Sequence, residues 1–366
     1  MLKVLDLIHR WTGGFVGVVL AVLGLSGALL VWRDDWIGLP HARDPLVADP
    51  AAIGAATARL LDGATGGESL IYASNRLGLI QLRLSEGAGA YADQSGTIVT
   101  RWASLSERPE LWLFDLHHHL LAGHTGETIT GIAGLCALLF AVTGAILWWR
   151  TRRTFRLRAL PKRLTRPAIV WHHRDLGIVV APLLMLAALT GTAMVFRPVA
   201  DFLLSPLGRP GTIEAALKPP RFAAGPLAPA LDWRRIVAEA HARFPDAQIR
   251  ILSLPKKPGD PIAVRMKRAA EWLPNGRSSV WFDPATGAVL GTRDALAMAP
   301  AAQAFNMAYP IHSAKVGGLA WRVVVSLTGL SLALLGSLAV WSFWFRRPRG
   351  AKPVRRWAEP VAEPAE

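Results

Sequence analysis

Histidine is the residue of this sequence best placed to do chemistry, because most of its copies stand at the beginning of a long apolar stretch. The chain of 366 residues has ten histidines, and eight of them occupy such positions. These eight are His9, His117, His118, His119, His124, His172, His173 and His312. Ionisable residues at membrane depth are functional candidates by default, and neutral imidazole is a common metal ligand. The expected chemistry is therefore ligation of a metal or a metal-containing cofactor within a membrane.

Four apolar stretches accompany these histidines. They cover Gly14–Trp32, Ile129–Trp149, Leu176–Phe196 and Gly317–Phe345, and their one charged residue is Arg322. Each has at least 19 residues, and about 20 residues cross a bilayer as a helix. Together with 52% hydrophobic and 18% charged residues overall, they predict a membrane protein. They exclude a soluble globular enzyme, a disordered chain and a β-barrel, whose strands alternate over about 10 residues.

The net charge of +15 is concentrated on one side of the predicted membrane. Lys and Arg gather in the N-terminal segment, in the connection Arg150–Asp175 and in the tail Arg346–Glu366. The positive-inside rule places these pieces, and so both termini, in the cytoplasm. We expect a multi-pass protein of a bacterial inner membrane, and this topology explains the basic charge without nucleic-acid binding. The first stretch is too long for a signal peptide and lacks an Ala-x-Ala exit.

The predicted fold is a four-transmembrane-helix bundle with two periplasmic α+β domains, internally duplicated. Each outer segment contains a strand–turn–strand pattern, at Tyr91–Val99 and at Val280–Leu290, in which Asp and Gly separate β-branched or aromatic runs. A helix is expected at Trp233–Phe244 with Asp232 as its cap, and strands at Gln248–Leu254 and Ile262–Met266. The expected layout is a cytoplasmic N-terminus 1–13, a first span 14–32, an outer domain 33–113, a periplasmic helix start and second span 114–149, a basic cytoplasmic loop 150–175, a third span 176–196, a second outer domain 197–309, a helix start and fourth span 310–345, and a cytoplasmic tail 346–366.

The chain repeats itself. A His-Arg-x-x-Gly frame begins at His9 and again at His173, and each is followed 17 residues later by a hydroxyl–glycine pair. His117 and His312 each precede a glycine by six residues. The repeated unit is a helix, an outer domain and a second helix. Related halves usually place a shared site between them.

Because successive spans alternate in direction, the histidines fall into one set per leaflet. His9 and His173 are expected at the cytoplasmic face, and His117 and His312 at the periplasmic face. Two imidazoles from facing helices in an apolar bundle suit axial ligation of haem iron, so we predict two haems b per chain. The iron of these haems is the one metal expected, because the single cysteine, Cys136, cannot build a thiolate cluster.

The ligand assignment leaves alternatives. His172 is the alternative to His173 at the inner haem. Successive helical residues lie about 100° apart, so one or two of the triplet at 117–119 face the bundle. His124 lies seven residues after His117 and is expected on the same helical face, which makes it an alternative outer ligand.

Glycines and arginines near the histidines complete the predicted haem sites. Gly27, Gly144 and Gly191 would leave room for a flat macrocycle, although small residues also serve close helix packing. Arg10 and Arg174 follow the inner histidines and could pair with haem propionates. Simple anchoring by the positive-inside rule explains these two arginines equally well.

The quoted motifs resemble those of the PepSY-associated transmembrane family, which includes iron-regulated membrane proteins and siderophore reductases. The matching pieces are His9-Arg10-Trp11 with Gly13, Leu116-His117 with Gly123, His173-Arg174-Asp175 with Gly177, and His312 with Gly318. The two Asp–Gly turns are similar to PepSY strand signals. The resemblance implies PepSY-like outer domains and a haem-containing inner-membrane protein that moves electrons outward, in some members to ferric siderophores.

The predicted function is that of a di-haem b transmembrane reductase. It would carry electrons from a cytoplasmic-side donor, a quinol or a separate reductase, to a ferric siderophore or other ferric chelate in the periplasm. Reduction to Fe(II) weakens hard-oxygen chelation and releases the iron. The sequence shows no dinucleotide fingerprint, and the catalytic residues stay unassigned. Basic residues of the outer domains, Arg265, Lys267 and Arg268, could attract an anionic chelate or simply form a solvated face.

Two other functions compete with this one. One is a membrane-anchored PepSY binding or regulatory protein without redox activity, for which matched intramembrane histidines would be superfluous. The other is a permease for a divalent metal ion. The middle of the predicted spans offers only Ser, Thr and Gly as polar residues, where a permease would need carboxylates.

Overall fold

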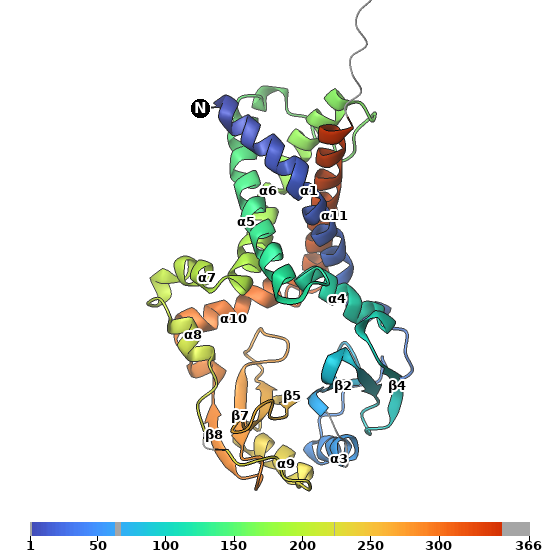
Figure 1. The fold of residues 1–366 in the computed structure, drawn as a ribbon, viewed down its shortest axis with the longest axis vertical. Helices are drawn as coiled ribbons and strands as arrows, with labels where there is room; N and C mark the ends of the chain where they lie inside the picture. Colours follow the sequence, from blue (N-terminus) through green and yellow to red (C-terminus); the bar gives the residue numbers. More distant parts are fainter. Residues whose placement is uncertain (1, 63–66, 223, 346–366) are drawn as a thin grey trace, which may run out of the picture.

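A computed structural model describes residues 2–62, 67–222 and 224–345. Four of its helices are long and apolar enough to cross a membrane, which confirms a multi-pass membrane protein. They are α1 (Leu2–Leu30), α5 (Gly123–Trp149), α6 (Arg166–Val195) and α11 (Gly318–Trp344). Figure 1 shows them as one bundle at one end of the molecule, with all the strands at the other end. The predicted tail 346–366 lies outside the described residues.

The helices differ from the predicted spans at their ends. The first and third helices begin 12 and 10 residues before the apolar stretches that start at Gly14 and Leu176. These two helices include the polar residues that precede each apolar stretch, because nothing in those residues interrupts the helix. The second and fourth predicted helices are each divided into two helices, because the backbone turns just before the span.

The breaks separate two short helices from the spans. Helix α4 (Pro109–His119) ends before α5, and α10 (Pro300–His312) ends before α11. Leu120, Leu121 and Ala314 have positive φ angles of 48°, 58° and 52°, a conformation that terminates a right-handed helix. The predicted boundaries at 114 and 310 therefore fall inside α4 and α10, and each of these helices runs in a different direction from the span that follows it (Figure 1).

The spans pair as α1 with α11 and as α5 with α6. Helices α1 and α11 approach closely at Gly24 and Gly329. A Cβ atom added to Gly24 would lie 2.5 Å from the carbonyl oxygen of Gly329, and one added to Gly329 would lie 2.6 Å from the carbonyl oxygen of Gly24. Small residues at such crossings let the backbones of membrane helices meet.

The two outer domains share one antiparallel sheet of eight strands. Its order is β4-β3-β2-β1-β5-β6-β7-β8, and the pairing of β1 with β5 joins the two halves. The strands are β1 (Gly67–Ile71), β2 (Ile80–Leu84), β3 (Gly89–Ala92), β4 (Ile98–Trp102), β5 (Gln248–Ser253), β6 (Ile262–Lys267), β7 (Ser278–Phe282) and β8 (Val289–Arg293). Each half is a meander of four strands, as expected for a duplicated sequence.

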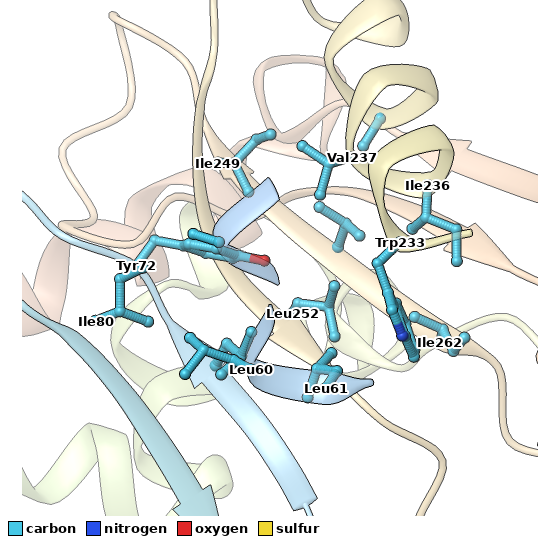
Figure 2. Packing of buried hydrophobic residues seen from close by; sticks show 14 of the residues in the cluster. Leu60, Leu61, Tyr72, Ile80, Trp233, Ile236, Val237, Ile249, Leu252 and Ile262 are labelled. Carbon is cyan, nitrogen blue, oxygen red and sulfur yellow. The ribbon is translucent and has the colours of Figure 1, made fainter. Parts of the chain in front are cut away.

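Helices α3 (Pro50–Leu61) and α9 (Trp233–Arg243) pack on one face of this sheet. Figure 2 shows Trp233, Ile236 and Val237 of α9 pointing at Leu252 and at the neighbouring strands. Asp232 caps α9 by accepting the N–H of Arg235 at 3.0 Å. The core confirms the predicted α+β architecture. The short helices α2 (Arg33–Trp36), α7 (Arg197–Leu203) and α8 (Thr212–Leu217) connect it to the bundle.

Both predicted hairpins are present. Asp93 accepts the N–H groups of Ser95 and Thr97 at 2.9 Å in the turn between β3 and β4. Asp283 does the same for Ala285 at 3.2 Å between β7 and β8. The glycine that closes each turn has a positive φ, which only glycine adopts without strain.

Candidate functional site

The outer histidine pair lies on the two short helices rather than on the spans. His117 of α4 and His312 of α10 face each other with ring centroids 6.2 Å apart and ring planes at 50°. One histidine comes from each half of the chain. Each short helix runs in a different direction from the span that follows it. This change of direction brings the two rings together at the end of the bundle that faces the sheet.

Each outer ring is oriented by a hydroxyl of a span. Ser26 Oγ of α1 lies 3.0 Å from His117 Nδ1, and Thr190 Oγ1 of α6 lies 3.1 Å from His312 Nδ1. Both hydroxyls donate their own proton to a helix carbonyl at 2.7 Å. The hydroxyl of Ser26 therefore accepts the Nδ1–H of His117, and the Nδ1–H of His312 is shared between Thr190 Oγ1 and the carbonyl of Ala187 at 3.0 Å. Both arrangements leave Nε2 with a free lone pair. This is the tautomer that ligates metals.

Glycines make room for the two outer rings. A Cβ atom added to Gly27 would lie 2.9 Å from Cε1 of His117, and one added to Gly191 would lie 3.0 Å from Cε1 of His312. Both distances are too short for an ordinary contact. The glycines thus lie against the imidazole rings, whereas the sequence led us to expect contact with a macrocycle.

A mostly apolar cavity opens beside the outer pair. It is lined by His117 and His312 and by apolar side chains of α1, α6 and α11, among them Leu23, Leu183 and Leu332. Arg33 and Lys315 also line it. With His118, which also lines it, the cavity combines an apolar body with three imidazoles and two cationic side chains.

An ion pair fixes one of these cations. Lys315 Nζ lies 2.6 Å from Oδ2 of Asp34, and Arg33 lies 3.4 Å from Oδ1. Burial raises the pKa of Asp34, but the charges of Lys315 and Arg33 outweigh it and hold the pKa below its usual range. Burial lowers the pKa of Lys315, and Asp34 offsets part of this effect. Asp34 is thus ionised at neutral pH beside two basic groups.

The inner histidine pair lies at the other end of the bundle. His9 of α1 and His173 of α6 have ring centroids 6.2 Å apart at 85°. Thr143 Oγ1 of α5 lies 2.8 Å from His9 Nδ1 and gives its proton to the carbonyl of Leu139. His9 is therefore held like the outer histidines, while among the described residues His173 has no such hydroxyl partner. A Cβ atom added to Gly144 would lie 3.6 Å from Cε1 of His9.

His172 is turned toward the connection between α5 and α6. It is fully buried, and its Nδ1–H donates to the carbonyl of Arg158 at 2.9 Å. The buried Asp175 forms salt bridges with Arg158 and with Arg174. Arg174 is thus engaged in holding this connection, and Arg10 pairs with Asp6 at 3.6 Å. Neither arginine is described in contact with a histidine ring.

The remaining predicted histidines take different positions. His118 lines the cavity and stacks on Phe114 with ring centroids 4.4 Å apart. His119 pairs with Asp115 at 2.8 Å. The side chain of His124 is 92% exposed. Since α4 ends at His119, the seven-residue spacing does not carry His124 onto the face of His117, and the expectation that the two share a face is corrected.

Comparison with known proteins identifies the family. A family described as the PepSY-associated TM region matches residues 7–168 and 170–300. The chain belongs to this family. A similar protein, described as uncharacterized, is found in Pseudomonas aeruginosa. It is 28% identical over 259 residues, which are 66% of this chain and 65% of the relative. The chain thus matches slightly less than two thirds of that relative's length.

Sequence reasoning missed several residues of this PepSY-associated protein. Thr143 was not predicted, although with the predicted Gly144 it forms a third hydroxyl–glycine pair like those at 26–27 and 190–191, and this signal could have identified it. The sequence did not indicate Arg33 and Lys315 as site residues, because only the folded positions of α2 and of the connection after α10 bring them to the cavity.

Proposed function

We propose that this protein is a membrane oxidoreductase that binds two haems b and transfers electrons across a bacterial inner membrane, with both termini in the cytoplasm. The donor would be a quinol or a cytoplasmic reductase. The acceptor would be a ferric siderophore or another ferric chelate on the periplasmic side, from which reduction releases Fe(II). Bound haem would supply a one-electron carrier at each histidine pair.

The observation that carries this proposal is the matched geometry of the two histidine pairs. If two imidazoles held one metal between them at the usual nitrogen–metal distance of about 2.0–2.1 Å, their ring centres would lie about 6.4 Å apart, because each ring centre is about 1.2 Å beyond its nitrogen. Both pairs show 6.2 Å. From His9 to Gly27, beside the outer pair, α1 rises about 27 Å at 1.5 Å per residue. The pairs would thus serve opposite leaflets.

The other residues of the sites support the same function. Hydroxyls hold the Nδ1–H of His9, His117 and His312, which keeps Nε2 unprotonated and fixes the plane of each ring. The apolar bundle excludes water from the pairs. Arg33 and Lys315 supply positive charge at the outer cavity, where the carboxylates of a haem would need counter-charges.

Haem content tests the proposal directly. The purified wild-type protein from haem-replete cells should show a b-type spectrum after dithionite reduction and about two haems per chain by pyridine haemochrome. His9→Ala and His173→Ala should each lose one haem, and His117→Ala and His312→Ala should each lose the other. His124→Ala is the control and should retain both.

Activity then separates the two sites. In liposomes with an internal donor, His312→Ala should abolish reduction of an external ferric chelate, while the inner haem is still reduced by dithionite. A folded, colourless wild-type preparation would reject the proposal and favour the membrane-anchored binding protein. Loss of haem in His172→Ala but not in His173→Ala would move the inner ligand by one residue.

A further inference from the structure

Six basic side chains near the outer cavity act electrostatically on one another or on the cavity residue Lys315. This basic layer consists of Arg76, Arg197, Arg250, Arg265, Lys267 and Arg277. Arg265 alternates along β6 with Val264 and Met266, which point into the core under α3 and α9. It therefore lies on the opposite face of the sheet from α3 and α9.

Hydrogen bonds tie this layer to the helix that carries His312. Arg265 Nε donates to the carbonyl of Gly276 at 2.7 Å. Arg277 Nε donates to Oδ1 of Asn306 in α10 at 3.0 Å. The guanidinium of Arg197 lies over the Phe305 ring of the same helix, at 4.3 Å. The layer thus borders α10 from the side of the sheet.

Arg250 connects the layer to the charged end of the cavity. It lies at a bulge in β5 and is only 5% exposed. It donates to the carbonyl of Ala73 and, at 3.1 Å, to Oδ1 of Asn275. Asp34, which pairs with the cavity residue Lys315, is the carboxylate whose charge acts on Arg250. Asp34 therefore lies between two basic groups, Arg250 of the sheet and Lys315 of the cavity.

The six positive charges of the layer are only partly compensated within the protein. The buried carboxylate of Glu271 acts on Arg265, Lys267 and Arg277, and Asp34 acts on Arg250. Among the described residues, none of the six forms a salt bridge, and the Nη1 atoms of Arg76 and Arg197 are buried without a hydrogen-bond partner. Burial lowers the pKa of Arg250 to about 10. Burial, together with the charges of Arg265 and Arg197, lowers the pKa of Arg277 to about 10. Buried positive charges without partners are costly unless a ligand supplies the missing negative charge.

We infer that the basic layer binds a metal chelate of net negative charge, held through its carboxylate or phenolate oxygens beside the outer histidine pair. Guanidinium groups recognise such oxygens through paired, charge-assisted hydrogen bonds. This inference deepens the proposed function, on which the identity of the metal as iron rests. Arg268, which the sequence grouped with Arg265 and Lys267, does not belong to the layer, because it is paired with Asp246 and Asp294.

Calorimetric titration with redox-silent chelates tests binding without electron transfer. The full chain in nanodiscs of zwitterionic phosphatidylcholine is titrated with Ga(III)–EDTA and Ga(III)–citrate as anionic probes, and with the cationic Ga(III)–desferrioxamine B. We expect at least one anionic chelate to bind, with an affinity that falls as salt is raised, and the cationic chelate not to bind. Arg277→Gln and Arg250→Gln should each weaken binding by about tenfold. Arg268→Gln is the matched control and should bind like the wild type.

The outcomes separate this inference from the proposed function. Absence of anionic binding in a protein that holds both haems overturns the inference alone. Binding in a colourless protein supports the inference and rejects the haem proposal. Equal binding of the cationic chelate, or loss of binding when anionic phosphatidylglycerol replaces the neutral lipid, also overturns it, the latter because lipid phosphate would then be the natural occupant. If Arg250→Gln or Arg277→Gln fails to fold, Arg76→Gln decides, since its Nη1 makes no hydrogen bond that the fold would lose.

Discussion

At the scale of the residue, the four histidines differ from ordinary interfacial histidines in how their rings are held. Three of them give the Nδ1 proton to a hydroxyl of a neighbouring helix. In each case a glycine directly follows the hydroxyl residue in the sequence, so that the ring can approach the helix backbone. The pairing of a hydroxyl with a glycine is therefore a device that sets both the tautomer and the position of an imidazole.

The glycines should be sensitive to a single added methyl group. In Gly27→Ala and in Gly191→Ala, the new Cβ would lie 2.9 Å and 3.0 Å from an imidazole carbon. We expect the ring to move and the outer haem to be lost, while the inner haem stays. Gly38→Ala is the control, because it lies outside the spans and a Cβ there meets no atom within 4 Å. Equal haem content in all three variants, measured by pyridine haemochrome, would contradict this explanation.

At the scale of the element, an ion pair fastens α2 to the connection between α10 and α11. Asp34 is 8% exposed and bonded to Lys315 at 2.6 Å. This connection follows His312 directly, so the pair also fixes the helix that presents the outer histidine. Its strength depends on the ionisation of Asp34.

Replacing this carboxylate should destabilise the protein at neutral pH. Asp34→Asn leaves Lys315 buried without a counter-charge, at an expected cost of about 3 kcal/mol. The pKa of Asp34 is lowered in the folded protein. Its contribution is therefore fully present above the unfolded value of about 3.9 and is lost as the pH falls through the folded value. Thermal unfolding should show a clear loss at pH 7 that shrinks below about pH 4.

A second carboxylate provides the comparison. Asp44 pairs with His41 at 2.8 Å, and both side chains are about half exposed. Exposed pairs contribute about 0–1 kcal/mol, so Asp44→Asn should change the unfolding temperature little. The interpretation fails if the two variants lose the same stability at pH 7.

At the scale of the whole molecule, each histidine pair takes one member from each half of the chain. His9 and His117 precede the connection between α5 and α6, whereas His173 and His312 follow it. The pairing of β1 with β5 joins the halves in the sheet, and the close contact of α1 with α11 joins them in the bundle. Neither half by itself contains a complete pair.

If the protein binds the two proposed haems, division of the chain should therefore remove both together. Residues 1–160 or 161–366 expressed alone should hold no haem, and co-expression of the two pieces should restore both. In the piece 161–366, α11 would lose its contact with Gly24 of α1. Recovery of haem binding therefore requires both pieces in one membrane. About one haem per chain in either piece alone would show that a pair can form within one half, against the geometry described above.

The sequence by itself determined the spans, the duplication, the hairpins and the grouping of the histidines into two sets at opposite ends of the bundle. These follow from local chemistry, because apolar runs, Asp–Gly turns and repeated motifs act over a few residues. It also proposed the family, which comparison confirmed.

Tertiary structure alone decided which imidazoles meet. The choice of His173 over His172 and the exclusion of His124 depend on helix phase and on the breaks at Leu120 and Ala314, where residues with ordinary helix propensity take positive φ angles under tertiary constraint. The joining of two outer domains into one sheet, and the assembly of the basic layer from residues that lie between positions 76 and 277, likewise required contacts between distant parts of the chain. Such contacts leave no periodic signal, since each residue is placed by a neighbour that sequence distance does not reveal.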